Sequence, residues 1–475
     1  MKAFNVVFKN TAFLFSADVI SRLLSFSLFL VIARTLGKTG LGDYSFIFAF
    51  TGLFWVFNDL GISTLFVREA AKDLKKADYL FKNVLSIKIL LVTLVALATI
   101  IGANFTSVSA NLALPIYVVA LAVFFQSFKD LSFSVFQAHQ RMLFVGIARS
   151  LEMLLLVVLG ILALLAGYGL LGLAFAFLIS YFLIFVLSAF AVRKLITIRF
   201  GFDFDFQKKF VKSSMPFWFT GLFIAIYFRI DTVMIAFFRG SAETGLYNAS
   251  YRLLDALYFV PAAVINAIFP AMSRLYVENK AVLRSLYRKF FYYLLAIALP
   301  MGVGVTLLAE RLILFIYGSE FSGSNIALQV LIWALVAVFL SSITGHLLNA
   351  VHKQLLFTLT TAFAAALNIG LNLFFIPYWG YMGAAASTLI TELVVLLGLL
   401  YFARKNSYSF NIFKLLLKPL AATVVMSLVI LLTLQLHVLI ILPVAAITYF
   451  AALFLIKGIE NEEVILIKSY LKQFI

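Results

Sequence analysis

The residues that could do chemistry in this chain are ionisable side chains inside long apolar stretches. Arg22, Arg229 and Arg252 are fixed cations of this kind, because a guanidinium group stays protonated in proteins. A charge at bilayer depth costs about 2.5–3.5 kcal/mol on insertion scales, which makes such residues functional candidates. Guanidinium forks match phosphate oxygens and can offset the penalty of moving an anion through a low-dielectric region. We therefore expect these three arginines to contact an anionic group in a hydrated cleft.

Three carboxylates form the second set of candidates. Glu392 lies near the middle of an apolar stretch and has no cation within one helical turn, which suits a group that binds and releases H+ or Na+. Asp18 and Asp255 are further candidates for such ion coupling. A structural role stays open for all three. Asp18–Arg22 (i,i+4) and Arg252–Asp255 (i,i+3) can neutralise each other, and Glu392 can be a protonated side chain bonded to a neighbouring helix.

Other charged residues in apolar stretches have simpler expected roles. Lys88 and Lys129 lie within about two turns of predicted helix ends, so we expect their ammonium groups to extend to the interface. Arg149 and Glu152 have the i,i+3 spacing of a neutralising pair.

No residue pattern points to catalysis. The sequence has no cysteine, and its four histidines (His139, His346, His352 and His437) lack metal-ligand spacing. We therefore expect no catalytic residue, no metal site and no cofactor, and the sequence argues against an enzyme.

The elements that must position these residues follow from composition. Of 475 residues, 64% are hydrophobic and 12% are charged, against about 45–50% and 25% in soluble domains. The mean hydropathy is +1.09. This balance excludes a soluble enzyme, a nucleic-acid-binding module and a disordered scaffold. The apolar runs do not alternate with polar residues, so they predict an all-α polytopic membrane protein and not a barrel.

About fourteen apolar segments are long enough to cross a bilayer of about 30 Å. Their approximate limits are 10–34, 40–64, 80–102, 112–137, 143–166, 169–192, 214–237, 246–270, 288–309, 325–350, 355–376, 381–403, 413–434 and 438–457.

The distribution of basic residues orients these segments. Lysines and arginines cluster in every second loop, around residues 68–82, 193–212, 274–289 and 404–418. The intervening loops hold little beyond Arg34, Lys38, Arg239 and Arg311. The positive-inside rule therefore predicts a cell-membrane protein with both termini in the cytoplasm. The net charge of +17 then needs no nucleic-acid partner.

An internal repeat divides the chain. Matched pieces recur at an offset of roughly 205–213 residues: Thr39-Gly40-Leu41 with Thr244-Gly245-Leu246, His139 with His352, Gly169 with Gly380, and Arg193-Lys194 with Arg404-Lys405. We expect two six-helix lobes, residues 1–200 and 201–410, followed by a helix pair and cytoplasmic tail in 411–475. An even number of spans per copy gives both lobes the same orientation, with a substrate site at their interface.

Several short motifs resemble the polysaccharide transporter branch of the multidrug/oligosaccharidyl-lipid/polysaccharide (MOP) flippase superfamily. They are Ser21-Arg22-Leu23, Ala33-Arg34-x2-Gly37, Asp59-Leu60-Gly61, Arg68-Glu69, Gly245-Leu246-Tyr247, Phe269-Pro270 with Ser273, Tyr317-Gly318-x2-Phe321, and Asn368-x3-Asn372 with Ile376-Pro377-x2-Gly380-x2-Gly383-Ala384-Ala385, Thr388 and Glu392. Leu28 and Phe29 stand where peptidoglycan-precursor flippases of this superfamily usually have an Arg-Asp pair, which argues against lipid II as the substrate.

The resemblance implies a flippase that moves a polyprenyl-(pyro)phosphate-linked oligosaccharide across the cytoplasmic membrane by alternating access, for cell-surface polysaccharide synthesis. The expected partners are this lipid-linked oligosaccharide, membrane lipids and a coupling H+ or Na+, with the protein as a monomer. A cation- or proton-coupled drug or metabolite antiporter of the multidrug extrusion type is the alternative, although its cleft would be acid-rich. The sequence leaves the glycan and its carrier open.

Overall fold

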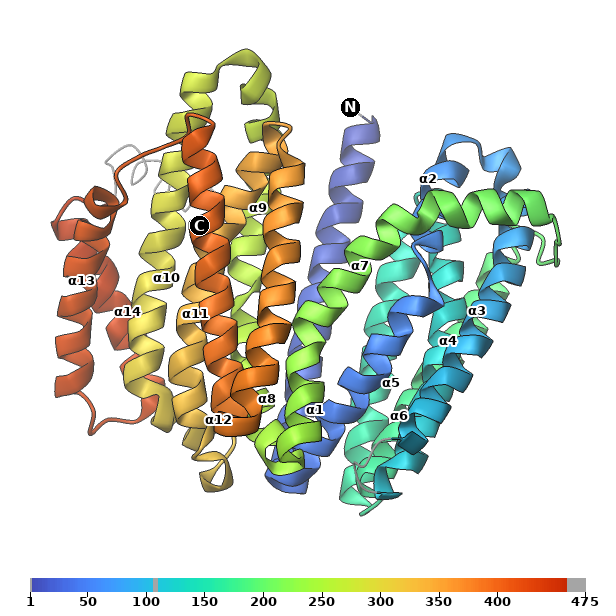
Figure 1. Ribbon diagram of the computed structural model, residues 1–475, viewed down its shortest axis with the longest axis horizontal. Helices are drawn as coiled ribbons and strands as arrows, with labels where there is room; N and C mark the ends of the chain where they lie inside the picture. Colours follow the sequence, from blue (N-terminus) through green and yellow to red (C-terminus); the bar gives the residue numbers. More distant parts are fainter. Residues whose placement is uncertain (1, 106–109, 459–475) are drawn as a thin grey trace. The chain divides into compact units, whose positions relative to one another are not determined.

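The computed structural model describes residues 2–105 and 110–458, with the side chains of 2–18, Ala110, Thr220 and Ile224 outside the description. The described residues fold into helices and turns (Figure 1). The α-helices are α1 (Lys2–Trp55), α2 (Ile62–Lys72), α3 (Ala77–Phe105), α4 (Ala113–Ala138), α5 (Met142–Leu165), α6 (Gly169–Val192), α7 (Phe204–Arg239), α8 (Ser241–Leu257), α9 (Phe259–Glu278), α10 (Lys280–Ile316), α11 (Ser324–Ala350), α12 (Gln354–Lys405), α13 (Ile412–Leu432) and α14 (Val438–Leu455). Four short 3-10 helices join them: η1 (Val56–Asn58), η2 (Leu74–Lys76), η3 (Ala110–Leu112) and η4 (Ser319–Phe321).

Within the described part of the chain, 11 helical stretches are long and apolar enough to cross a membrane, and the bent pair Phe204–Phe223 and Ala225–Arg239 makes a twelfth. This confirms the prediction of an all-α polytopic membrane protein. Two of these stretches are much longer than one crossing, because α1 has 54 residues and α12 has 52. At 1.5 Å per residue each would extend about 80 Å if straight.

Glycines interrupt both long helices. Gly37 in α1 has φ 67 and ψ −172, and Gly380 in α12 has φ 58 and ψ −140. Positive φ values are readily available only to glycine, and the chain turns back at each of these positions (Figure 1). Gly240 (φ 83) between α7 and α8 and Gly169 (φ 54) at the start of α6 have the same property. Gly169 and Gly380 are a pair of the sequence repeat.

The chain divides into two compact units, Met1–Asn248 and Ala249–Ile475, so the division lies inside α8. The predicted limits 1–200, 201–410 and 411–475 stay a prediction, and the predicted cytoplasmic tail falls largely on residues 459–475, outside the described residues.

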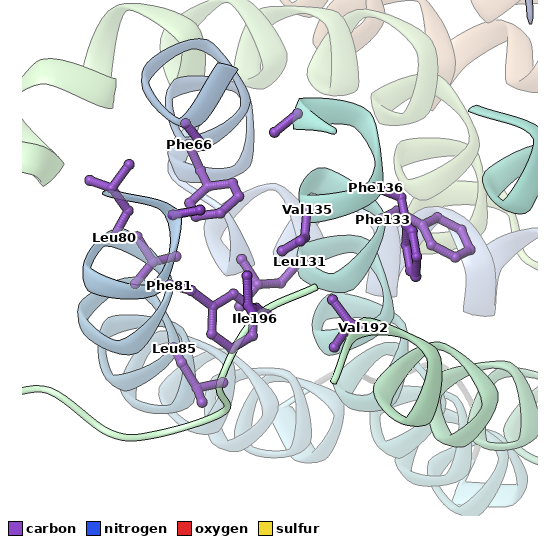
Figure 2. Close-up of a cluster of buried hydrophobic side chains, with 14 of the residues drawn as sticks. Phe66, Leu80, Phe81, Leu85, Leu131, Phe133, Val135, Phe136, Val192 and Ile196 are labelled. Carbon is purple, nitrogen blue, oxygen red and sulfur yellow. The ribbon is translucent and has the colours of Figure 1, made fainter. Parts of the chain in front are cut away.

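The core of the first unit is aromatic and aliphatic. One cluster joins Phe66 of α2, Phe81 of α3 and Leu131 of α4 to Ile196 in the segment after α6 (Figure 2). In this unit α7 lies along α1 and α2. Their approach is close, because a Cβ added at Gly61 would lie 2.5 Å from the Ser214 carbonyl oxygen.

In the second unit, α13 and α14 pack against α10. Tyr449 of α14 is buried and its hydroxyl donates to the Ala296 carbonyl of α10 at 2.6 Å. A second core cluster joins α11 and α12 through residues that include Leu348, Ala364 and Leu399.

Connections that the sequence predicts on one side of the membrane meet at one end of each unit. In the first unit the Thr197 N–H donates to Asp78 at 2.7 Å, and the Gly201 N–H donates to the Lys82 carbonyl at 3.1 Å. In the second unit Arg311 donates to the Leu436 carbonyl at 3.1 Å, which joins two connections of the opposite predicted side.

Candidate functional site

A buried ion pair lies where the helix that begins after Gly37 is broken. Leu60 and Gly61 take positive φ values of 46 and 73 between η1 and α2. Asp59 accepts the N–H of Ser63 at 3.2 Å and the Lys88 ammonium at 2.6 Å. Lys88 is only 1% exposed, so the expectation that it extends to the interface is wrong. A partner 29 residues away in the sequence satisfies its charge in place.

A second buried lysine is held between two carboxylates in the same unit. Lys129 of α4 is 3% exposed, and its ammonium lies 2.5 Å from Glu152 of α5 and 3.9 Å from Asp130. It also lies 4.9 Å from the centre of the Tyr181 ring of α6. The interface expectation is therefore wrong for Lys129 too, and Glu152 pairs with this lysine of the neighbouring helix.

A polar cavity of about 400 Å³ opens beside this cluster. It is lined by residues of α2, α4 and α5: Ser63, Thr64, Val67, Arg68, Asp130, Phe133, Ser134, Gln137 and Arg149. The Arg68 guanidinium lies 2.9 Å from Glu69, whereas among the described residues no carboxylate lies within 4.0 Å of the Arg149 guanidinium. The cavity thus combines hydroxyl and amide donors with two arginines and one carboxylate, Asp130, a composition that suits a phosphate or sugar ligand.

Arg229 belongs to the surroundings of the same cluster. It interacts electrostatically with Tyr181, as does Glu152. Its guanidinium packs over Gly52 of α1, where an added Cβ would lie 3.6 Å from Nε. The Arg229 side chain is exposed and lies against α1 at Gly52, where no side chain is in its way.

Arg22 is exposed on α1. It stands about 15 residues before Gly37, and Arg229 stands about 11 residues before Gly240, which correspond to roughly 22 Å and 17 Å of helix. Both arginines are thus well inside their spans. The side chain of Asp18 lies outside the described residues.

The second unit holds the other predicted residues. Arg252 lies on α8 at 4.0 Å from Asp255, with the two side chains 26% and 42% exposed. Glu392 of α12 is buried, with 4% exposure. Tyr258 interacts electrostatically with both Glu392 and Asp255. The structure therefore places Asp255 and Glu392 near one tyrosine within this unit, with Arg252 beside Asp255.

A close contact joins the turn after Gly37 to the start of α8. A Cβ added at Gly42 would lie 1.7 Å from the Ser241 carbonyl oxygen, and one at Gly245 would lie 1.8 Å from the Lys38 carbonyl oxygen. The Ser241 hydroxyl donates to the Asp43 carboxylate. Only glycine at positions 42 and 245 allows the two backbones to approach this closely.

Two carboxylates outside the spans have pKa values below their ordinary range. The Tyr79 hydroxyl donates to Asp203, and this hydrogen bond lowers the pKa of Asp203. Hydrogen bonds from Lys72 and from Arg68 lower the pKa of Glu69. Asp203 also accepts the Phe206 N–H and so begins α7 as a negatively charged cap.

Sequence reasoning missed the partners of the two buried lysines and the cavity beside Arg149. The one available signal was that Asp59, Lys88, Lys129, Asp130 and Glu152 all interrupt apolar runs, so each needed a partner. Among the described residues, no group of three His, Asp or Glu could hold a metal ion.

Comparisons with known proteins identify the family. The sequence profile described as "Polysaccharide biosynthesis protein" matches residues 7–276. The chain is 20% identical over 402 residues to the capsular polysaccharide biosynthesis protein CapF of Staphylococcus aureus, covering 84% of this chain and 99% of that protein. It is 22% identical over 389 residues to the probable low-salt glycan biosynthesis flippase Agl15 of Haloferax volcanii, covering 80% and 79%.

The fold has a solved counterpart. A structure of the lipid II flippase MurJ in an inward closed conformation matches with a TM-score of 0.78 at 18% identity, over 92% of this chain and 97% of that one. At this identity the match shows the fold. The chain belongs to the Polysaccharide biosynthesis protein family, a family of multi-pass membrane transporters and not of enzymes.

Proposed function

We propose that this protein is a flippase that moves a polyprenyl-(pyro)phosphate-linked oligosaccharide across the cytoplasmic membrane by alternating access, for cell-surface polysaccharide or glycan synthesis. The observation that carries the proposal is the presence of arginines well inside the spans of a chain of this family. The relative named as a glycan biosynthesis flippase, matched over most of both chains, supports it.

Arg22, Arg229 and Arg252 are the proposed contacts of the substrate phosphates. A diphosphate in the low-dielectric part of the membrane needs fixed positive charge near its path. Arg229 supports this role because it is exposed, lies beside Gly52 and interacts electrostatically with Tyr181. The cavity beside Arg149 adds a polar volume large enough for a phosphate group and an attached sugar.

Glu392 and Asp255 are the proposed ion-coupling residues, with Asp18 as a third. A buried carboxyl group beside Tyr258 can take up H+ or Na+ and thereby change the charge that Arg252 faces. This arrangement would couple substrate movement to an ion gradient.

The proposed architecture has fourteen crossings, in which α1 and α12 each count as two because of their glycine turns. They form two six-helix lobes and a C-terminal pair, in a monomer with both termini in the cytoplasm. The matched glycines with positive φ support the duplication, and the meeting of the predicted same-side connections supports the alternation of sides.

The contact of residues 38–43 with residues 241–245 is the proposed closure on the outer side. While the two backbones touch at these glycines, the substrate path is closed on the outer side. When they separate, the path opens. The hydrogen bond from Ser241 to Asp43 adds to this contact.

Reconstitution tests the proposed function. Liposomes that carry the protein and a fluorescent polyprenyl-diphosphate oligosaccharide are treated with an impermeant quencher, and flipping is the protected fraction over time. We expect Arg22→Ala with Arg252→Ala to slow flipping by roughly tenfold or more, because a hydrogen bond to a charged group contributes about 1.5–3 kcal/mol. Arg239→Ala, which removes an exposed cation 2.9 Å from Glu243, is the matched control. Unchanged flipping in the double variant would contradict the proposal that Arg22 and Arg252 contact the substrate phosphates.

The antiporter alternative is tested in the same liposomes. Extrusion of a cationic dye under a proton or sodium gradient, without flipping of the lipid-linked oligosaccharide, would favour it. Two arginines and one carboxylate line the cavity (Arg68, Arg149 and Asp130), and this excess of cations argues for the flippase, because a cationic drug prefers an acidic site.

A further inference from the structure

The second unit holds a separate pocket of about 370 Å³ where three connections meet. These are the α9–α10, α11–α12 and α12–α13 connections, and all three are in loops that the sequence predicts on the cytoplasmic side. The lining residues are Tyr276, Lys280, Ala281, Arg284, Val351, Lys353, Asn406, Ser407 and Tyr408.

The pocket is cationic. Lys280, Arg284 and Lys353 contribute three positive charges, and none of the nine lining residues is acidic. The nearby Glu278 lies 3.6 Å from Arg274, which partly neutralises it. A site with this charge and polar side chains favours an anionic ligand.

Its walls are fixed by contacts within the unit. Arg284 donates to the Ser409 carbonyl at 2.8 and 3.2 Å through Nη2 and Nε, and a guanidinium has five N–H donors, so donors remain for a ligand. The Lys280 ammonium lies 5.2 Å from the centre of the Tyr276 ring. Tyr408, which also lines the pocket, is buried. Arg284 is therefore held in place before a ligand arrives, whereas Lys280 and Lys353 are exposed and accessible to it.

Exposed apolar side chains lie next to these cations along the chain. Val277 and Val282 flank Lys280, with 81% and 47% exposure, and Leu355 follows Lys353 with 66% exposure. This arrangement matches a phospholipid, whose phosphate group would lie among the cations at the helix ends and whose acyl chains would lie along the apolar side chains. Basic pockets between helix ends on the cytoplasmic side are known to bind anionic headgroups.

We propose that this pocket binds the phosphodiester headgroup of an anionic phospholipid of the inner leaflet, with the acyl chains along Val277, Val282 and Leu355. The bound headgroup joins the start of α10 to the connection that leads into α13. It thereby stabilises the attachment of the α13–α14 pair. This site does not depend on the proposed flipping activity.

Lipid titration of the purified full-length protein tests the proposal. Phosphatidylglycerol, phosphatidylcholine and inorganic phosphate are added separately, and apparent melting temperature and bound lipid by native mass spectrometry are measured. We expect phosphatidylglycerol alone to bind and to raise the melting temperature. Lys280→Gln with Lys353→Gln should weaken its binding by on the order of tenfold or more, since each basic residue near a membrane surface contributes about 1 kcal/mol.

The controls separate charge at this site from charge in general. Lys208→Gln with Lys209→Gln removes the same charge from exposed positions of the first unit and should leave lipid binding unchanged. Lys280→Arg with Lys353→Arg should retain it. Equal phosphatidylglycerol binding by wild type and the Lys280/Lys353 glutamine variant would overturn the proposal. So would displacement of the lipid by equimolar inorganic phosphate, or equal counts of bound phosphatidylcholine and phosphatidylglycerol on the wild-type protein, a measurement that needs no variant.

Discussion

Single residues in the first unit show how a lysine is accommodated inside the membrane. Lys88 and Lys129 each lie within 2.6 Å of a carboxylate oxygen from another element. Replacing one member of a buried pair leaves an uncompensated charge, whereas replacing both can be nearly neutral. The stability of the protein with these buried lysines therefore depends on their carboxylate partners.

This difference predicts the behaviour of two Lys88 variants. We expect Lys88→Met to destabilise the protein by about 1.5–3 kcal/mol, because Asp59, whose side chain is 32% exposed, loses its hydrogen bond from a charged group. Lys88→Met with Asp59→Asn should recover most of that loss, since the amide oxygen can still accept from Ser63. Apparent melting temperatures in detergent measure both.

The exposed pair of Lys72 and Glu69 provides the control for this comparison. Lys72 is 61% exposed, so Lys72→Met should change stability by at most about 1 kcal/mol. If Lys88→Met lowered the melting temperature no more than Lys72→Met, the pair of Lys88 and Asp59 would not contribute to stability.

At the scale of helices, glycines decide where the chain turns and where helices touch. Gly42 and Gly245 face the carbonyl oxygens of Ser241 and Lys38, and neither position has room for a methyl group. Gly370 in α12, by contrast, has nothing within 4 Å of an added Cβ. Substitution by alanine should therefore disturb the contact at Gly42 or Gly245 and leave the structure around Gly370 unchanged.

Gly42→Ala should separate residues 38–43 from residues 241–245. Overpacking costs about 1–3 kcal/mol, which shifts the closed population by roughly fivefold or more. Because the protein has no cysteine, Asp43→Cys with Ser241→Cys reports this contact by cross-linking. We expect a high yield in the parent background, a several-fold lower yield with Gly42→Ala and an unchanged yield with Gly370→Ala. Equal yields in all three would mean that the contact tolerates a side chain.

The helices were predictable, and the partners of their charged residues were not. A span needs only a run of about 20 apolar residues, so the predicted segments follow the helices within a few residues at most ends. The segment 40–64 is one exception, because the chain continues past the break at Gly61 as α2 to Lys72. The segments 214–237 and 288–309 also begin too late, because α7 begins at Phe204 and α10 at Lys280. The pairing of Lys129 with Glu152 depends on how α4 and α5 pack, which their apolar periodicity leaves open. The cavity beside Arg149 is formed by residues of three helices, so it depends on how all three pack together.

At the scale of the whole molecule, the orientation in the membrane decides from which side the substrate enters. The basic residues in alternate connections predict that those connections lie in the cytoplasm. Connections of one predicted side contact each other within each unit, as Thr197 with Asp78 and Arg311 with Leu436. The two ends of each unit are therefore distinct, and one labelled residue per end identifies the side.

Single-cysteine labelling determines the orientation, because every introduced thiol is the only one in the chain. Tyr168→Cys and Ser319→Cys lie in exposed connections with few basic residues, and Lys209→Cys and Lys405→Cys are exposed at the basic ends. We expect an impermeant maleimide to label the first two in intact cells and the last two only after permeabilisation. The two positions of each kind come from different units, so each unit is oriented independently. The reverse pattern would place the basic connections outside and invert the proposed direction of entry. Disagreement between the units would contradict the parallel duplication from which the two-lobe architecture is inferred.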